Sequence, residues 1–300
     1  MKRFLTILIA LAVAVSAFSA EKNAKYITKD FDLKGFSNIY AYGIVDVQLE
    51  RSNSWSVSVT MPEDFENYLN VKVSGNKLSI GTSGIPRKLQ SRFSEWKVTA
   101  KVSMPILRGL ELSGASKFNC KDSFDIGDNT FDLEISGAGK AYGIDIVGKG
   151  IDVEMSGAAM AEVNGDFEKV EIEIGGASRC DFNANAGRVD VELSGAGKAF
   201  LFGEYGDMFI DAGGASVLKL DGAALFIGAE ASGASKIEGG DSPVNRAKLI
   251  LSGASFCQLN VLEKISVEAS GGASLRYSGH EGLDLDIVSI SRGASVTKYR

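Results

Sequence analysis

The side chains best suited to chemistry in this 300-residue sequence are carboxylates and cations that recur at constant spacing around a repeated four-residue turn. Three positions before the second residue of the turn stand Glu111, Glu134, Glu154, Glu173, Glu192, Asp211 and Glu230. Five positions before it stand Asp132, Asp152, Glu171 and Asp190. Three positions after it stand Lys117, Lys140, Arg179, Lys198 and Lys236. One flank of the turn is therefore acidic and the other is basic.

So many carboxylates raise the question of catalysis or metal binding. A polysaccharide-cleaving site needs two acids at a defined separation, or acids that converge with Arg, Lys or His. These acids instead follow one another along a ladder. The single histidine, His280, is far more typical of an inert loop residue, and neither G-x-S-x-G, H-E-x-x-H nor a Cys/His ligand spacing occurs. The sequence predicts no catalytic residue, no cofactor and no metal site.

The turn itself is the strongest signal in the chain. Ten copies resembling Ser-Gly-Ala-Ser follow one another in steps of 19 to 23 residues, and a constant step of this size is typical of a stacked solenoid. We expect their second residues to be structural corner positions, because glycine tolerates backbone conformations and close approaches that a Cβ resists. These residues are Gly114, Gly137, Gly157, Gly176, Gly195, Gly214, Gly233, Gly253, Gly272 and Gly293.

Short alternating segments precede the turns and identify the type of solenoid. They read FDLEI (131–135), IDVEM (151–155), VEIEI (170–174) and VDVEL (189–193), which is the two-residue period of a strand with one buried face. No segment between turns is long enough for a helical repeat. The sequence therefore predicts an all-β fold, a parallel β-helix with coils of about 19–20 residues stacked roughly 4.8 Å apart.

Two columns of apolar residues are expected inside the coils. One lies two positions before the turn glycine, from Leu112 and Ile135 to Leu251, and the other lies four positions after it, from Phe118 to Cys257. Cys180 and Cys257 share the second column four coils apart, which is about 19 Å and beyond disulfide reach. We expect these two cysteines and Cys120 to be buried and unpaired.

The rest of the chain divides around the repeats. Residues 1–20 have the basic start, apolar run and small residues of a signal peptide, so the protein is expected to be exported. Residues 21–108 are rich in strands and are expected to form N-terminal capping coils, while 109–300 hold the regular repeats. Ser289 and Ser291 fall at inward positions, which is typical of a C-terminal cap. The net charge of −6 disfavours nucleic acid, and no transmembrane span is predicted.

These elements together resemble the putative auto-transporter adhesin, head GIN domain family of secreted bacterial proteins. The resemblance lies in Ala41-Tyr42-Gly43-Ile44-Val45-Asp46-Val47, Leu78-Ser79-Ile80, Met104-Pro105-Ile106-Leu107, the Ser-Gly-Ala turns and Tyr277-Ser278-Gly279, and it extends over about residues 35–295. It implies a right-handed β-helix and a role in cell adhesion, and it assigns no catalytic residue.

Several functions fit this combination. The first hypothesis is a non-catalytic adhesin-like protein, periplasmic, attached to the outer membrane or extracellular, that binds an extended polymer such as a glycan or a matrix protein. The candidate binding surface is the basic column, which consists of Lys117, Lys140, Arg179, Lys198 and Lys236. The alternatives are a structural or envelope-stress protein without a specific ligand and, less favoured, a polysaccharide-active enzyme.

Overall fold

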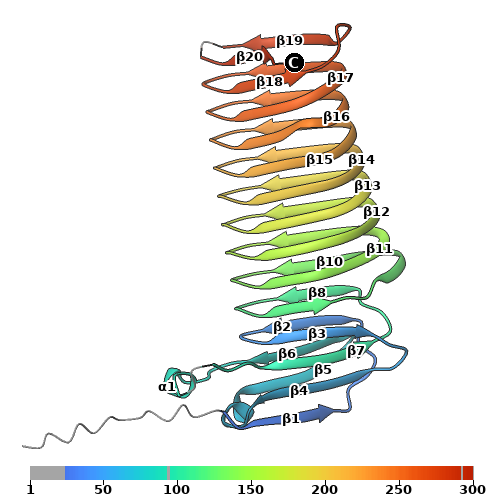
Figure 1. The fold of residues 1–300 in the computed structure, drawn as a ribbon, viewed down its shortest axis with the longest axis vertical. Helices are drawn as coiled ribbons and strands as arrows, with labels where there is room; N and C mark the ends of the chain where they lie inside the picture. The colour runs from blue at the N-terminus through green and yellow to red at the C-terminus, as the bar shows by residue number, and fades with distance from the viewer. Residues whose placement is uncertain (1–23, 93–94, 292, 300) are drawn as a thin grey trace, which may run out of the picture.

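The structure is a computed structural model that describes residues 24–92, 95–291 and 293–299. Its chain winds into a column of stacked β-coils that stands on an N-terminal base (Figure 1). The predicted all-β parallel β-helix is confirmed, because strands of successive coils pair in parallel with a step of 19 or 20 residues. The expected signal peptide, residues 1–20, lies outside the described residues.

The regular part of the column begins with the short strands β8 (Gly109–Leu112) and β9 (Lys117–Cys120). From there, one long strand follows each turn, crosses one flank, bends, and crosses the other flank to the next turn. The exception is β10 (Phe124–Ile135), which begins after β9 and leads to the next turn; the strands that cross both flanks are β11 (Lys140–Met155), β12 (Met160–Ile174), β13 (Arg179–Leu193), β14 (Lys198–Ala212), β15 (Val217–Ala231), β16 (Lys236–Leu251) and β17 (Phe256–Ala269).

The core runs through the middle of the column and is made by alternate residues of every strand. Both predicted interior columns are buried, including Leu112 to Leu251 before the corner and Phe118 to Cys257 after it. Cys120, Cys180 and Cys257 are buried free thiols, as expected. Because successive coils pair in parallel and in register, each inward apolar residue lies next to the equivalent residue of the coil before it.

The Ser-Gly-Ala turns form a single sharp corner along the column. Gly176, for example, has a φ of +68°, and the amide of the next residue, Ala177, donates to the carbonyl of Gly157 at 2.7 Å. A Cβ built on Gly176 would lie 2.5 Å from that same oxygen. Glycine is required here for two reasons, the left-handed backbone and the close approach of the neighbouring coil.

The last two corners differ from the positions expected from sequence. In the ninth turn the positive φ belongs to Gly271, and Gly272 occupies the place that alanine holds elsewhere, since its amide donates to the Gly253 carbonyl at 2.7 Å. In the tenth turn Gly293 has a φ of +99°. The hydrogen bond from the Ala294 amide to the Ser291 carbonyl is equivalent to that from Ala273 to Ser270 in the ninth turn, so Gly293 aligns with Gly272. The glycine of the Gly-Ala motif therefore lies one residue after the corner position in both turns. The motif misplaces the corner here because hydrogen bonds between coils set the register.

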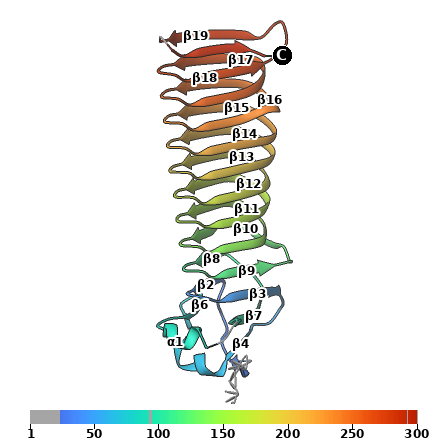
Figure 2. The ribbon, with the colours of Figure 1, turned by 60° about the vertical axis from the view of Figure 1, so that its left-hand side comes forward.

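An additional coil that the repeat pattern does not reveal lies at the start of the column. It consists of β2 (Asn38–Tyr42) and β3 (Asp46–Arg51), with Gly43 at the corner at a φ of +76°. This coil pairs with β8 and β9 on one side, and on the other with β6 (Lys77–Thr82) and β7 (Thr99–Met104). The first coil in the sequence is therefore the second along the axis (Figure 2).

Antiparallel strands close the base, which is not a simple series of capping coils. The strand β4 (Ser56–Pro62) pairs antiparallel with β7 and with β1 (Tyr26–Phe31), and β5 (Leu69–Ser74) pairs antiparallel with β6. The short helices η1 (Glu63–Tyr68) and α1 (Arg87–Gln90) join them. Both tryptophans help to fill this base, Trp55 against Phe36 and Trp96 edge-on against Phe65.

The other end consists of β18 (Ser274–Ser278), β19 (Asp284–Ile290) and β20 (Ser295–Lys298). The inward position expected for Ser289 is wrong. The register between β17 and β19 shifts after Ile287, so that Ser289 pairs with the outward Glu268 and Ile290 pairs with the buried Ala269. Ser291 is likewise an exposed residue before the turn. The bulge at this point reverses the alternation on which the expectation depended.

Candidate binding surfaces of the solenoid

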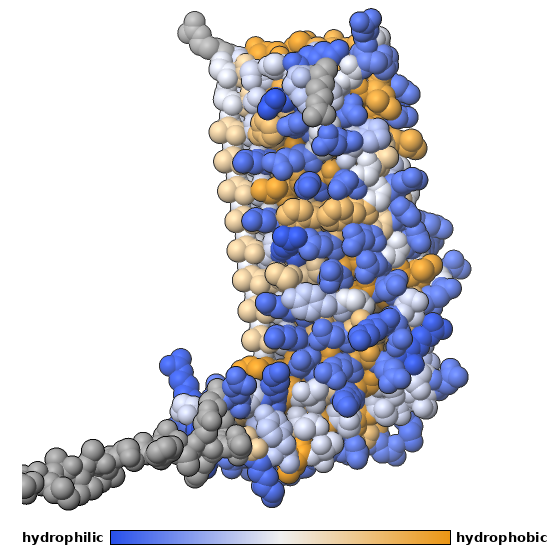
Figure 3. All heavy atoms as spheres, in the orientation of Figure 1, coloured by the Kyte–Doolittle hydropathy of each residue, from blue (hydrophilic) through white to orange (hydrophobic). Residues whose placement is uncertain are grey.

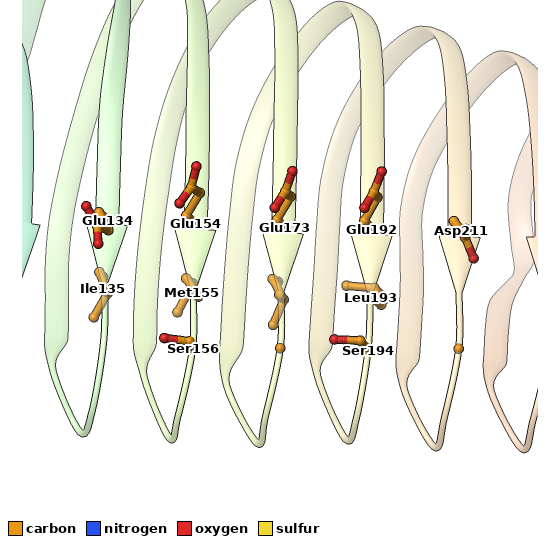
Figure 4. A pocket seen from close by; sticks show the side chains of 13 residues that line it. Glu134, Ile135, Glu154, Met155, Ser156, Glu173, Glu192, Leu193, Ser194 and Asp211 are labelled. Atoms are coloured by element: carbon orange, nitrogen blue, oxygen red, sulfur yellow. The ribbon is translucent and has the colours of Figure 1, made fainter.

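The acidic flank carries its carboxylates in a line parallel to the axis. Parallel pairing places Glu134, Glu154, Glu173, Glu192 and Asp211 at the same position on successive coils. Between these side chains and the corner runs a shallow groove of about 450 Å³, and Figure 4 shows the carboxylates aligned along it. None of these five carboxylates forms an ion pair within the described part of the chain. The groove is therefore strongly acidic.

The second acidic column is partly neutralised by cations two residues earlier on the same strand. Lys169 pairs with Glu171, and Arg188 forms two hydrogen bonds of 2.8 Å with Asp190. Asp152 has no such partner among the described residues. Burial raises the pKa of its carboxyl, and the neighbouring Glu171 and Asp132 raise it further. Pairing within a strand explains how like charges stack at this spacing.

An aromatic hollow interrupts the acidic pattern on the same flank, and the analysis of the sequence did not single it out. Phe209 continues the column of Asp190, and its ring lies 5.9 Å from that of Phe226 in an edge-on arrangement. Gly228 leaves space between them, and Ile250 completes an opening of about 430 Å³. Phe209 and Ile250 are more than a third exposed. The sequence signal that could have revealed this hollow is the change from an acidic residue to phenylalanine at one outward position of the repeat.

The predicted basic column is brought together on the opposite flank. Parallel register aligns its five cations at one position of successive coils, and the same register inserts Met160 and Val217 into the column. The order along the axis is therefore two cations and one apolar residue, twice, followed by a cation. The complete order is Lys117, Lys140, Met160, Arg179, Lys198, Val217 and Lys236.

One member of the basic column is already engaged within the protein. The guanidinium of Arg179 bonds both carboxylate oxygens of Asp181 at 2.8–3.1 Å and lies 4.1 Å from the centre of the Phe200 ring. This contact holds Arg179 flat against the surface. The four lysines have no ion pair with any described residue, so their ammonium groups remain accessible to a ligand.

Groups suited to catalysis do not converge in the described residues. No three His, Cys, Asp or Glu side chains there are arranged to hold a metal ion. His280 accepts a hydrogen bond from the amide of Gly282 at 2.9 Å through Nδ1. Burial raises the pKa values of Cys180 and Cys257 to about 12, so both remain protonated thiols at neutral pH. None of the helices described is long and apolar enough to cross a membrane.

These features define a class of protein, a repeat-built β-solenoid whose charged columns present regular surfaces to solvent. Comparison with known families assigns it further. The family described as putative auto-transporter adhesin, head GIN domain, matches residues 35–204 and again 183–280, and the chain belongs to this family. A search of curated proteins gives no match.

Solved structures of similar fold come from proteins of Parabacteroides species. A putative adhesin from Parabacteroides distasonis ATCC 8503 superposes with a TM-score of 0.54 at 17% identity, over 88% of this chain and 98% of that one. A putative adhesin from Parabacteroides merdae ATCC 43184 gives 0.56 at 17% identity, over 93% and 98%. At this identity the similarity concerns the fold.

Proposed function

We propose that the protein is a non-catalytic, adhesin-like binding protein of the cell envelope or its exterior that engages an extended anionic polymer along the basic column. The chain's membership of a putative adhesin family supports a binding role. Its signal-peptide-like start supports export. The ligand class is a polyanion such as an acidic glycan or an acidic stretch of a matrix protein.

The observation that carries this proposal is the register of the basic column. Hydrogen bonds between coils hold the lysines at heights that are multiples of roughly 4.8 Å. Two cations followed by an apolar residue repeat every three coils, or about 14 Å. A polymer with regularly spaced anionic groups and apolar faces would meet matching side chains along its length. The acidic flank across the corner would repel the same polymer, so binding is confined to one face.

Each contact of this exposed kind is weak, typically under about 1 kcal/mol. Several contacts on one rigid scaffold add up, because after the first one binds, the others occur at high effective concentration. Binding should therefore strengthen with polymer length and weaken with salt. A folded ligand that reaches only one coil would gain nothing from the repeat.

The test uses sulfated glycan oligosaccharides of increasing length, titrated against the protein at several salt concentrations. Lys140, Lys198 and Lys236 are changed to Glu one at a time and together, which leaves the pair between Arg179 and Asp181 intact. Affinity should fall with each change, by up to about fivefold per lysine lost. A control with the same net charge changes exposed lysines away from the column, Lys88, Lys149 and Lys248. Unchanged binding in the triple variant, or equal losses in the control, would contradict the proposal.

A further inference from the structure

At the C-terminal end of the column, the described residues leave the hydrophobic core uncovered. Ile287 and Ile290 continue the interior columns of Val267 and Ala269, with which they pair. One coil earlier Val267 and Ala269 are 1% and 2% exposed, whereas Ile287 and Ile290 are 45% and 42% exposed. An apolar rim at this end is visible as orange atoms at the top of Figure 3. A solenoid normally protects such an end with a polar terminal repeat.

The backbone is also open at this end. Within the described residues β19 pairs only with β17, and β20 pairs only with β18, so the outer edge of each strand presents unpaired N–H and C=O groups. The opposite end of the column is different, because its outermost strand β1 runs antiparallel to β4 and carries Lys29, which pairs with Glu66. Charged residues on an edge strand discourage further pairing, and β19 has none beyond its first three residues.

The shape of the exposed surface restricts what can cover it. Ile287 and Ile290 lie in one sheet, while the partly buried Val296 continues the interior column of Leu275 in the other sheet. A single added strand would pair with β19 or with β20 and leave the other sheet exposed. Another coil, with strands in both sheets, covers the two edges and the core between them at once.

We propose that this end binds the same end of a second copy of the chain, which forms a two-fold symmetric dimer. A two-fold axis perpendicular to the column pairs β19 with its counterpart in antiparallel fashion, and pairs β20 likewise. The antiparallel arrangement brings the acidic start of β19, Asp284 and Asp286, next to the Ile290 end of the partner strand. The Asp284 carboxylates of the two copies then stay at opposite ends of a strand pair about 20 Å long, which limits their repulsion, and Asp286, one residue from the middle, is exposed to solvent.

A head-to-tail stack is not favoured, because the N-terminal end offers antiparallel strands and a charged edge in place of an open coil. Contacts between identical ends close after two copies and do not extend into fibres. The dimer would be a rod of double length with one basic column in each half. This inference does not depend on the proposed function, since it concerns a different surface and a different partner.

The test measures the mass of the exported chain by analytical ultracentrifugation over a range of concentrations. The wild type should sediment as a dimer that dissociates on dilution. Changing both Ile287 and Ile290 to Lys should raise the dissociation constant by at least about a hundredfold, because it replaces two apolar residues of each copy with ammonium groups and brings the two charges at position 287 opposite one another. The control Leu225→Lys alters an apolar residue that is 58% exposed on another surface and should leave the dimer intact.

A second readout does not depend on the stability of the lysine variant. Ile287→Cys places a thiol at the middle residue of β19, which lies opposite its own counterpart in the antiparallel pair, and Ser194→Cys places one at the corner of the acidic flank. Under oxidising conditions only the first should give an inter-chain disulfide in high yield. A wild type that remains monomeric at all concentrations would overturn the proposal. A dimer unaffected by the two lysines, or equal cross-linking of both cysteine variants, would also overturn it.

Discussion

Replacement of a corner glycine should separate two costs that coincide at this position, the left-handed backbone and the clash with the neighbouring coil. Gly176 and Gly127 have φ values of +68° and +59°, so alanine at either must adopt a left-handed conformation, at about 1–2 kcal/mol. Only at Gly176 does the new Cβ meet backbone, 2.5 Å from the Gly157 oxygen. A Cβ at Gly127 has nothing within 4 Å.

The clash at Gly176 has no easy relief. The two coils are held together beside it by hydrogen bonds from Ala177 to Gly157 at 2.7 Å and from Arg179 to Ala159 at 2.9 Å. Forcing an extra carbon into so tight a contact costs about 1–3 kcal/mol. Gly176→Ala should therefore lose roughly 2–5 kcal/mol, and Gly127→Ala should lose only the conformational part of about 1–2 kcal/mol.

The assay is denaturant-induced unfolding followed by circular dichroism, with thermal unfolding as a check. A 1 kcal/mol loss should lower the melting temperature by about 2–4 °C in a protein of this size. Repeat proteins can unfold in stages, so the two variants are compared over the same cooperative transition. Equal losses at the two positions would refute the close approach as a reason for glycine. No loss at either would refute the corner assignment altogether.

Three further predictions concern buried and charged groups. Cys180 and Cys257 should react with a thiol reagent only after denaturation, because both are fully buried and their pKa is raised to about 12; rapid native labelling would contradict this. The raised pKa of Asp152 means that the folded state holds the proton more tightly than the unfolded chain, so its ionisation destabilises the protein as pH rises above about 4. Asp152→Asn should therefore raise the melting temperature at pH 7 and not below pH 3, and a gain independent of pH would argue against this cause. Ser235→Ala should leave the free energy of unfolding nearly unchanged, since the buried Ser235 hydroxyl has no partner among the described residues. Ser116→Ala should lower it by about 1 kcal/mol, because the Ser116 hydroxyl donates to the Ala41 carbonyl at 3.1 Å. A larger loss for Ser235→Ala than for Ser116→Ala in chemical unfolding would contradict these hydrogen-bond assignments.

The charge distribution links the fold to the proposed role. A parallel β-helix repeats each outward position once per coil, so a single residue preference becomes a charged column along the molecule. Lys140 and Lys198 lie on one flank, while Glu154 and Glu192 lie on the other. The binding of an anionic polymer that we propose would therefore require only weak local contacts and a long, rigid scaffold.

The repeat and its alternation alone determine most of the column. Corner glycines such as Gly176, interior residues such as Leu193, and the alignment of Lys140 with Lys198 all follow from a constant step and a side-chain period of two. Each of these properties is local to one coil and is repeated in the next. They can therefore be predicted without knowledge of the rest of the molecule.

Other features depend on contacts between distant segments or on a local shift of register, and only the tertiary structure decided them. The coil with Gly43 lies between β6 and β8 because hydrogen bonding between strands selects its neighbours, irrespective of sequence order. The bulge after Ile287 turns Ser289 outward, and a register shift of one residue reverses every inward and outward assignment that follows. The contact of Arg179 with Asp181 and Phe200 likewise depends on which side chains the coils bring together.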